Sequence, residues 1–158
     1  MIAIVYLALF QPDIAANAAA AARLCACLDV PLEIIEPCGF VFDDRRLRRV
    51  GLDYLERAAL TRHPSWDAFE RWRAANGGRL VLLSTHAQEA HHAVAYRRDD
   101  ILLAGRESAG VPDEVSARAD LRVRVPMAPG RRALNVVTAL AIVLGEALRQ
   151  TGRFPAGG

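Results

Sequence analysis

Two glycine-containing loops could bring backbone groups close to a ligand. The first is residues 105–112 (GRESAGVP), and the second is residues 126–135 (PMAPGRRALN). Glycine allows backbone amides and carbonyls to approach a ligand closely. The second loop leads into a predicted helix, whose N-terminal amides favour anions. On pattern alone the first loop is more typical of a generic tight turn than of a ligand site, and at the second loop Asn135 can serve simply as the cap of the helix that follows.

Polar and charged side chains supply further candidates. Asn17 and Arg23 lie six positions apart in a predicted helix, where their ordinary roles are to cap the helix and to form a surface ion pair. Arginines gather in a polar segment and again in the second loop: Arg45, Arg46, Arg48, Arg49, Arg131 and Arg132. A guanidinium group binds phosphate through two parallel hydrogen bonds, although an arginine cluster is also typical of a solvated surface.

Other chemistries lack their sequence signatures. The chain contains no Ser-His-Asp order, no Walker loop and no GxGxxG pattern, so hydrolase and nucleotide-triphosphatase functions lose most of their support. His91 and His92 have no third ligand at a recognisable spacing, and we expect no metal site. The three cysteines form neither a CxxC pair nor a zinc pattern, and their odd number disfavours a disulfide scaffold.

The order of predicted elements indicates how these residues are positioned. We expect five strands, at residues 2–9, 32–35, 80–83, 101–104 and 121–125, and helices at 15–28, around 66–73 and at 134–148. The polar segment 43–54 is predicted to be an exposed loop with a helical turn. Strands that alternate with helices favour an α/β fold with a mainly parallel sheet and helices on both faces. Ligands of such sheets bind beyond the carboxyl ends of the strands, here the loops after Leu83, Ala104 and Val125.

The composition is that of one folded domain spanning residues 1–158. The chain has a mass of 17.2 kDa and 53% hydrophobic residues, enough to form a core. Its 20 basic residues are all arginine, and with 18 acidic residues the net charge is +2, which does not by itself predict nucleic-acid binding. The apolar start lacks a basic region and stops at Pro12, so we expect a strand rather than a leader or a membrane span, and a cytoplasmic protein.

Blocks of sequence along nearly the whole chain resemble one known group of enzymes. They occur in order at residues 17–26, 34–40, 43–54, 61–63, 105–112, 125–127, 134–135 and 145–150. Together they resemble the SPOUT superfamily of RNA methyltransferases, and within it the small tRNA 2'-O-methyltransferases that act on the wobble nucleotide. Several blocks in the correct order are far more specific than any single loop.

The resemblance implies a fold, a cofactor and partners. It implies a C-terminal trefoil knot, a homodimer and binding of the tRNA anticodon stem-loop. The arginines named above are the candidates for holding the RNA, because of their surface charge. The knot loops of the family bind S-adenosylmethionine, and the corresponding positions here are Leu83, Gly105, Glu107, Val125, Met127, Ala133 and Leu134. The implied catalytic residues are Arg23, Asn17 and Asn135. We therefore expect the stretches near residues 83, 105 and 125 to converge on one cavity beside Arg23.

The sequence also departs from the family pattern. Alanine stands at position 19 where the family has glycine and at position 133 where it has serine, and Gly145 replaces an aromatic residue. These changes bear on rate and substrate choice more than on cofactor binding, and a knotted RNA-binding protein that has lost catalysis is the alternative function. A guanidinium keeps its proton below a pH of about 12, so Arg23 is expected to position the hydroxyl and stabilise the developing oxyanion, while phosphate or water accepts the proton.

Overall fold

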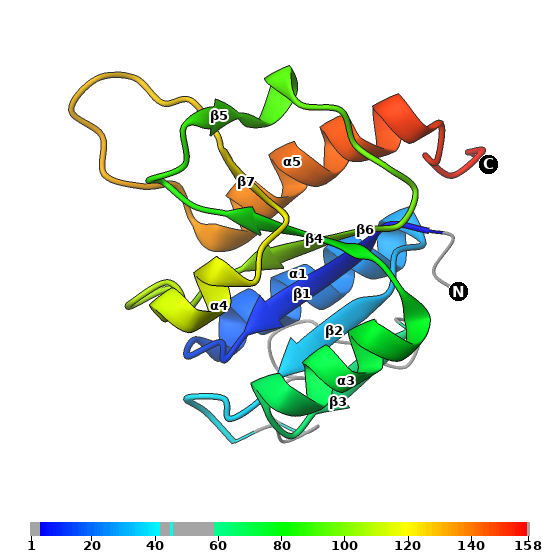
Figure 1. The fold of residues 1–158 in the computed structure, drawn as a ribbon, viewed down its shortest axis with the longest axis vertical. Helices are drawn as coiled ribbons and strands as arrows, with labels where there is room; N and C mark the ends of the chain where they lie inside the picture. Colours follow the sequence, from blue (N-terminus) through cyan, green and yellow to red (C-terminus); the bar gives the residue numbers. More distant parts are fainter. Residues whose placement is uncertain (1–3, 42–44, 46–58, 158) are drawn as a thin grey trace.

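The computed structural model describes residues 4–41, 45 and 59–157. Within these residues one parallel sheet has the strand order β3-β2-β1-β6-β4-β7-β5 (Figure 1). Its strands are β1 (Tyr6–Phe10), β2 (Leu32–Ile35), β3 (Leu60–His63), β4 (Arg79–Leu83), β5 (Glu89–Ala90), β6 (Asp100–Ala104) and β7 (Leu121–Arg124). Buried apolar strands suit a parallel sheet because helices cover both of its faces.

Helices cover each face of the sheet and enclose two apolar cores. They are α1 (Ala15–Leu28), α3 (Trp66–Asn76), α4 (Asp113–Ala117) and α5 (Val136–Thr151), with a 3-10 turn, η1, at His91–Ala93. Residues of α1 and α5 pack in one core, and Phe69 of α3 and Val115 of α4 pack in the other. The predicted α/β class with helices on both faces is confirmed. No helix in the described ranges is both long and apolar enough to cross a membrane.

Several predicted boundaries were wrong, and two strands were not predicted. β3 is an edge strand with Thr61 and Arg62 exposed, so its apolar pattern is weak, and β5 is only two residues long. The first strand begins at Tyr6 and ends at Phe10. The last strand ends at Arg124, and the last helix covers Val136–Thr151. The polar segment predicted at 43–54 lies outside the described residues except for Arg45, which is exposed.

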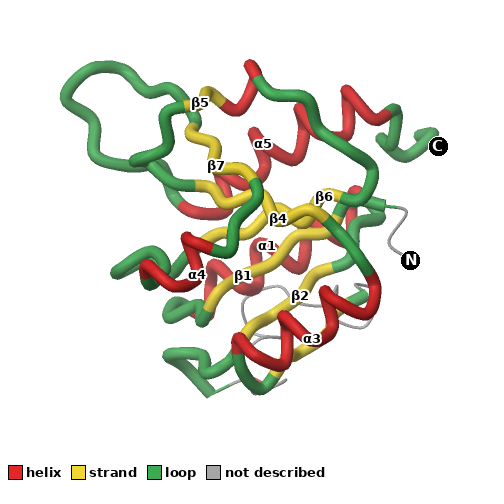
Figure 2. The backbone as a smooth tube through the Cα atoms, in the orientation of Figure 1, coloured by secondary structure: helices red, strands yellow, loops and turns green. Residues whose placement is uncertain are grey.

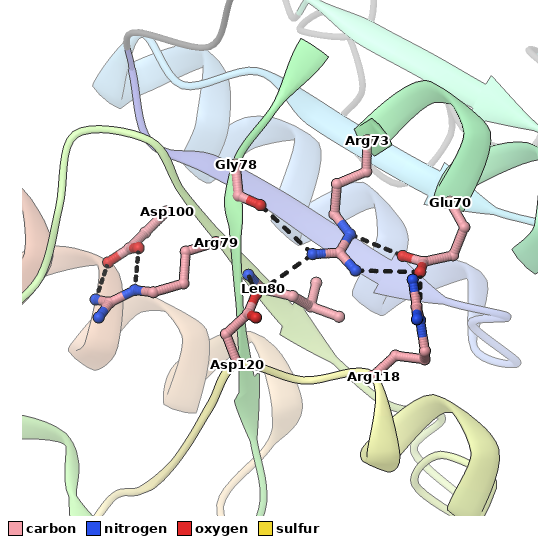
Figure 3. A network of polar contacts seen from close by, with 8 residues as sticks. All are labelled: Glu70, Arg73, Gly78, Arg79, Leu80, Asp100, Arg118 and Asp120. Carbon is pink, nitrogen blue, oxygen red and sulfur yellow. Dashed lines mark hydrogen bonds and ion pairs between the residues drawn. The ribbon is translucent and has the colours of Figure 1, made fainter. Parts of the chain in front are cut away.

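A network of ion pairs aligns the amino ends of the central strands (Figure 3). Asp100 is fully buried at the start of β6, and both of its oxygens accept hydrogen bonds of 2.8 Å from the Arg79 guanidinium at the start of β4. Asp120, just before β7, accepts a 2.7 Å bond from the Leu80 backbone N–H and a second bond from Arg73. The carboxylate of Glu70 in turn holds Arg73. The contacts lock β4, β6 and β7 into register.

We expect Asp100→Ala to lower the free energy of unfolding by about 3 kcal/mol, because it leaves the Arg79 guanidinium partly buried without its carboxylate. Urea denaturation followed by circular dichroism measures the change. The matched control is Asp99→Ala at the neighbouring, partly buried position, for which we expect a loss below about 1 kcal/mol. Equal losses in the two variants would contradict a special role for the Arg79–Asp100 pair.

Candidate active site

One cavity lies at the carboxyl ends of β4, β6 and β7. The register pairs Leu83 with both Ala104 and Val123, so these strands end at the same level. The loops that follow them extend from one edge of the sheet (Figure 2). They surround a cavity of about 700 Å³, together with the start of α1. The three stretches that the sequence singled out therefore converge, although they are far apart along the chain.

The loop after β6 has a shape that requires glycine. The backbone N–H groups of Arg106 and Gly110 each donate to the carbonyl oxygen of the other, both at 2.9 Å. A Cβ added at Gly105 would lie 2.6 Å from the carbonyl carbon of Gly110, and Gly110 itself has a φ of +63°. The loop is thus the tight turn that its sequence suggested, and it also lines the cavity.

Glu107 ties this loop to the start of α1. Its carboxylate accepts a 3.0 Å bond from the backbone N–H of Asp13 and a 3.1 Å bond from the Asn17 side-chain amide. The Ser108 hydroxyl donates to the Asp13 carboxylate. Burial, followed by the interaction with the Asp13 side chain, raises the pKa of Glu107 above its ordinary value. The two segments, some ninety positions apart, form one polar cluster at the cavity.

Asn135 extends this cluster to α5. Its Nδ2 donates to Oδ1 of Asn17 at 3.0 Å, while its own Oδ1 accepts from the backbone N–H groups of Val137 and Thr138. The expected capping role of Asn135 is confirmed. Asn17 does not cap α1, because Ile14 occupies the N-cap position. Glu107, Asn17 and Asn135 form a continuous chain of hydrogen bonds, called here the polar relay, which joins three segments around the cavity.

The structure gathers most of the candidate residues but not all of them. The cavity lining includes Asn17, Asn135 and the positions that the resemblance matches to cofactor binding: Leu83, Gly105, Glu107, Val125, Met127, Ala133 and Leu134. Arg23 does not line the cavity; it is exposed on α1, about two turns after Asn17. The three loops therefore converge on one cavity as expected, but within a single chain this cavity is not lined by Arg23.

The remaining candidates lie outside the cavity. Arg131 and Arg132 are exposed on the loop before α5, as is Arg45 in its own segment, whereas Arg46, Arg48 and Arg49 fall outside the described residues. Ala19 is buried in the apolar core, so its methyl group does not narrow the cavity. The parts of the chain that the structure describes hold no cluster of three His, Cys, Asp or Glu residues suited to a metal.

Sequence reasoning missed several residues that line the cavity. Ile14 precedes the predicted helix, and Asp113 and Ser116 belong to the short helix α4, which was not predicted. Arg106 lies inside a loop that was singled out, but its sequence position gave no sign that its side chain borders the cavity. Only the tertiary fold brings these residues together.

Two substitutions at Asn135 separate its two roles. Asn135→Asp keeps an oxygen that accepts from Val137 and Thr138, and a negative charge is favourable at a helix N-terminus. We therefore expect the free energy of unfolding to stay within about 0.5 kcal/mol of the original, but to fall by about 1 kcal/mol in Asn135→Ala. Aspartate cannot donate to Asn17, so both variants should break the polar relay. Thermal denaturation measures the change in stability, and an assay of the methyl transfer that the family resemblance implies measures the change in activity. Full activity of Asn135→Asp would show that the relay is not needed for that activity.

Comparison with known proteins identifies relatives over nearly the whole chain. The family model described as SpoU rRNA Methylase matches residues 4–145. A tRNA (cytidine(34)-2'-O)-methyltransferase from Beijerinckia indica is 57% identical over 92% of this chain and 91% of that relative. A solved structure that concerns 2-OH methylation of C/U34 on tRNA is 36% identical, covers 95% of this chain and 97% of that one, and has a TM-score of 0.87.

A more distant structure supports the fold alone. The SpoU methyltransferase AviRb from Streptomyces viridochromogenes, solved in complex with the cofactor AdoMet, has a TM-score of 0.83 at 24% identity and covers 95% of this chain and 61% of that one. The resemblance inferred from the sequence blocks is confirmed by the family match and by the high identity of the first relative. The chain belongs to the SpoU rRNA methylase family.

Proposed function

We propose that this chain transfers a methyl group from S-adenosylmethionine to the ribose 2'-hydroxyl of the wobble nucleotide, cytidine or modified uridine, in the tRNA anticodon. One observation carries the proposal: the three loops matched to the family's cofactor site line a single cavity, into which the polar relay also faces with Asn17 and Asn135. The relatives named for methylation of position 34 support the choice of substrate.

The cavity suits a nucleoside-containing cofactor. Its volume of about 700 Å³ lies within the usual range for small-molecule sites. Leu83, Val125 and Leu134 offer apolar surface, and Gly105 and Gly110 line the cavity without a side chain of their own. The residues present therefore fit S-adenosylmethionine, which, when bound, supplies a methyl group on a positively charged sulfur.

Side chains of this chain orient the ribose 2'-hydroxyl that accepts the methyl group and stabilise the negative charge that develops on its oxygen. The polar relay fixes the orientation of the Asn17 amide, because Glu107 accepts from its nitrogen and Asn135 donates to its oxygen. Correct orientation alone can lower a barrier by several kcal/mol. Arg23 positions the ribose hydroxyl or a neighbouring phosphate and stabilises the oxyanion that develops, while water or phosphate accepts the proton. Arg131 and Arg132, exposed near the cavity, and the arginines at 45–49 bind the anticodon stem-loop.

We propose a homodimer that forms through α1 and α5. Exposed residues recur along α1 at helical spacing: Ala16, Ala20, Arg23 and Cys27. Ile142 is exposed on α5, which packs beside α1, so the two helices present one surface of mostly small or apolar side chains. Arg23 lies on this surface, and a second subunit would bring it to a shared site.

The family resemblance also supports a trefoil knot and a cytoplasmic location.

The Ala20→Arg variant tests this dimer. A long charged side chain in the middle of the surface is expected to weaken association at least tenfold, measured by sedimentation equilibrium over micromolar concentrations. Ala74→Arg, at an exposed position on α3, is the control and should associate like the original protein. A protein that sediments as a monomer before any substitution would contradict the dimer.

The function is tested by the product. Purified protein and S-adenosylmethionine are incubated with tRNA from a strain that lacks the equivalent methyltransferase, and nucleoside mass spectrometry follows. We expect a new 2'-O-methyl group at position 34. Binding of tRNA without methyl transfer would favour the alternative, a knotted RNA-binding protein that has lost catalysis.

A further inference from the structure

Arg106 lines the cavity and lies against an aromatic ring. Its guanidinium carbon lies 5.4 Å from the centre of the Phe10 ring, and its Nε is buried and makes no hydrogen bond. Within the described residues, no hydrogen bond or ion pair joins its side chain. Other partly buried arginines differ: Arg73 is held by Glu70 and Arg79 by Asp100.

A half-buried guanidinium without an anion is energetically unusual. It loses part of its hydration. The cation–π contact with Phe10 returns only about 1 kcal/mol and leaves the buried Nε–H without an acceptor among the described residues. The guanidinium presents paired donors that match the two oxygens of a carboxylate or a phosphate. The contact with Phe10 restrains the guanidinium before any ligand arrives, so less side-chain entropy is lost on binding.

Arg106 and Glu107, which are neighbours in the loop, contact different parts of the protein. The Glu107 carboxylate contacts Asp13 and Asn17 at the start of α1. Arg106 instead contacts Phe10, which belongs to the core under α3 and α4 and packs edge-on against Trp66. The cavity thus has carboxylate and amide groups on one side of this loop. On the other side it has a cation with no counter-ion in the part of the chain that the structure describes.

We propose that Arg106 binds an oxyanion in this cavity through its paired donors. The inference rests on the proposed function, which supplies two groups of this chemistry: the carboxylate of the cofactor's methionyl part and a phosphate of the bound RNA. Arg106 is in either case a binding residue for the reaction, distinct from the polar relay.

Calorimetry with two probes tests whether Arg106 binds the carboxylate of the cofactor. S-adenosylhomocysteine carries the amino-acid part, and 5'-methylthioadenosine carries the same nucleoside thioether without it. If the anion is the carboxylate, Arg106→Ala weakens binding of S-adenosylhomocysteine at least tenfold and leaves that of methylthioadenosine unchanged. Arg106→Lys keeps the charge but loses the paired geometry, so it should restore only part of the affinity. Arg98→Ala, at an exposed arginine away from the cavity, is the control.

Measuring tRNA affinity at several salt concentrations tests whether Arg106 binds a phosphate of the RNA. If the anion is a phosphate, Arg106→Ala weakens tRNA binding and lowers the slope of log K against log salt by about one, with no change for either small probe. Unchanged affinity in every titration would overturn the proposal, as would equal loss for both small probes, which indicates a damaged loop. If the original protein binds neither small probe, the proposed function itself fails.

Discussion

Replacing Arg23 with alanine is expected to reduce methylation of tRNA by at least about 100-fold, the loss typical when one group that stabilises a developing oxyanion is removed. Arg23 is exposed on α1 and does not line the cofactor cavity of its own chain. Its removal should therefore leave the affinity for S-adenosylhomocysteine and the sedimentation of the protein unchanged. Single-turnover transfer of a labelled methyl group from S-adenosylmethionine to tRNA measures the effect.

The matched control is Arg71→Ala, which removes an exposed arginine from α3 on the opposite face of the sheet. It should keep full activity, because it changes the net charge equally but lies away from the cavity and from α1. Unchanged turnover of Arg23→Ala would remove Arg23 from the mechanism. Equal losses in the two variants would assign the effect to overall charge.

Replacing Gly105 with alanine is expected to weaken cofactor binding at least tenfold and to lower the free energy of unfolding by about 2 kcal/mol. The new Cβ would lie 2.6 Å from the carbonyl carbon of Gly110, so one side of the loop must move. That movement separates Arg106 from Gly110. The two backbone hydrogen bonds between these residues close the loop beside the cavity. Calorimetric titration with S-adenosylhomocysteine and urea denaturation measure the two effects.

Gly145 provides the control because the same change meets open space there. An added Cβ at this position of α5 has no heavy atom within 4 Å. Gly145→Ala should raise the free energy of unfolding by about 0.5 to 1 kcal/mol, since alanine is the better helix former, and should leave cofactor affinity unaltered. Cofactor affinity of Gly105→Ala equal to that of the original protein would contradict the role of the loop.

Local sequence predicted the elements that carry the site. The alanine-rich run gave α1 its observed bounds, and the strand at 32–35 was also correct. The apolar runs ending near Leu83 and Ala104 located two of the three loops at the cavity, because parallel strands present their carboxyl ends at one edge. Propensity and periodicity are local properties, and they suffice for such elements.

The contacts between side chains at the site could not be predicted from local sequence. Asn17 contacts Glu107 and Asn135 across about 90 and 118 positions of sequence, and no periodic pattern specifies such partners. The prediction of a capping role for Asn17 rested only on its residue type, which is common at helix caps, whereas its neighbours in space decide its role. The contact of Arg106 with Phe10 likewise depends on a turn after β6 that returns toward the end of β1.

The most direct measurement is a crystal structure of the protein with S-adenosylhomocysteine. We predict electron density for the nucleoside between the turn at Gly105 and the loop from Val125 to Leu134, within reach of Asn17. Density at another surface, or none at saturating ligand, would show that these loops do not form the methyl-donor site.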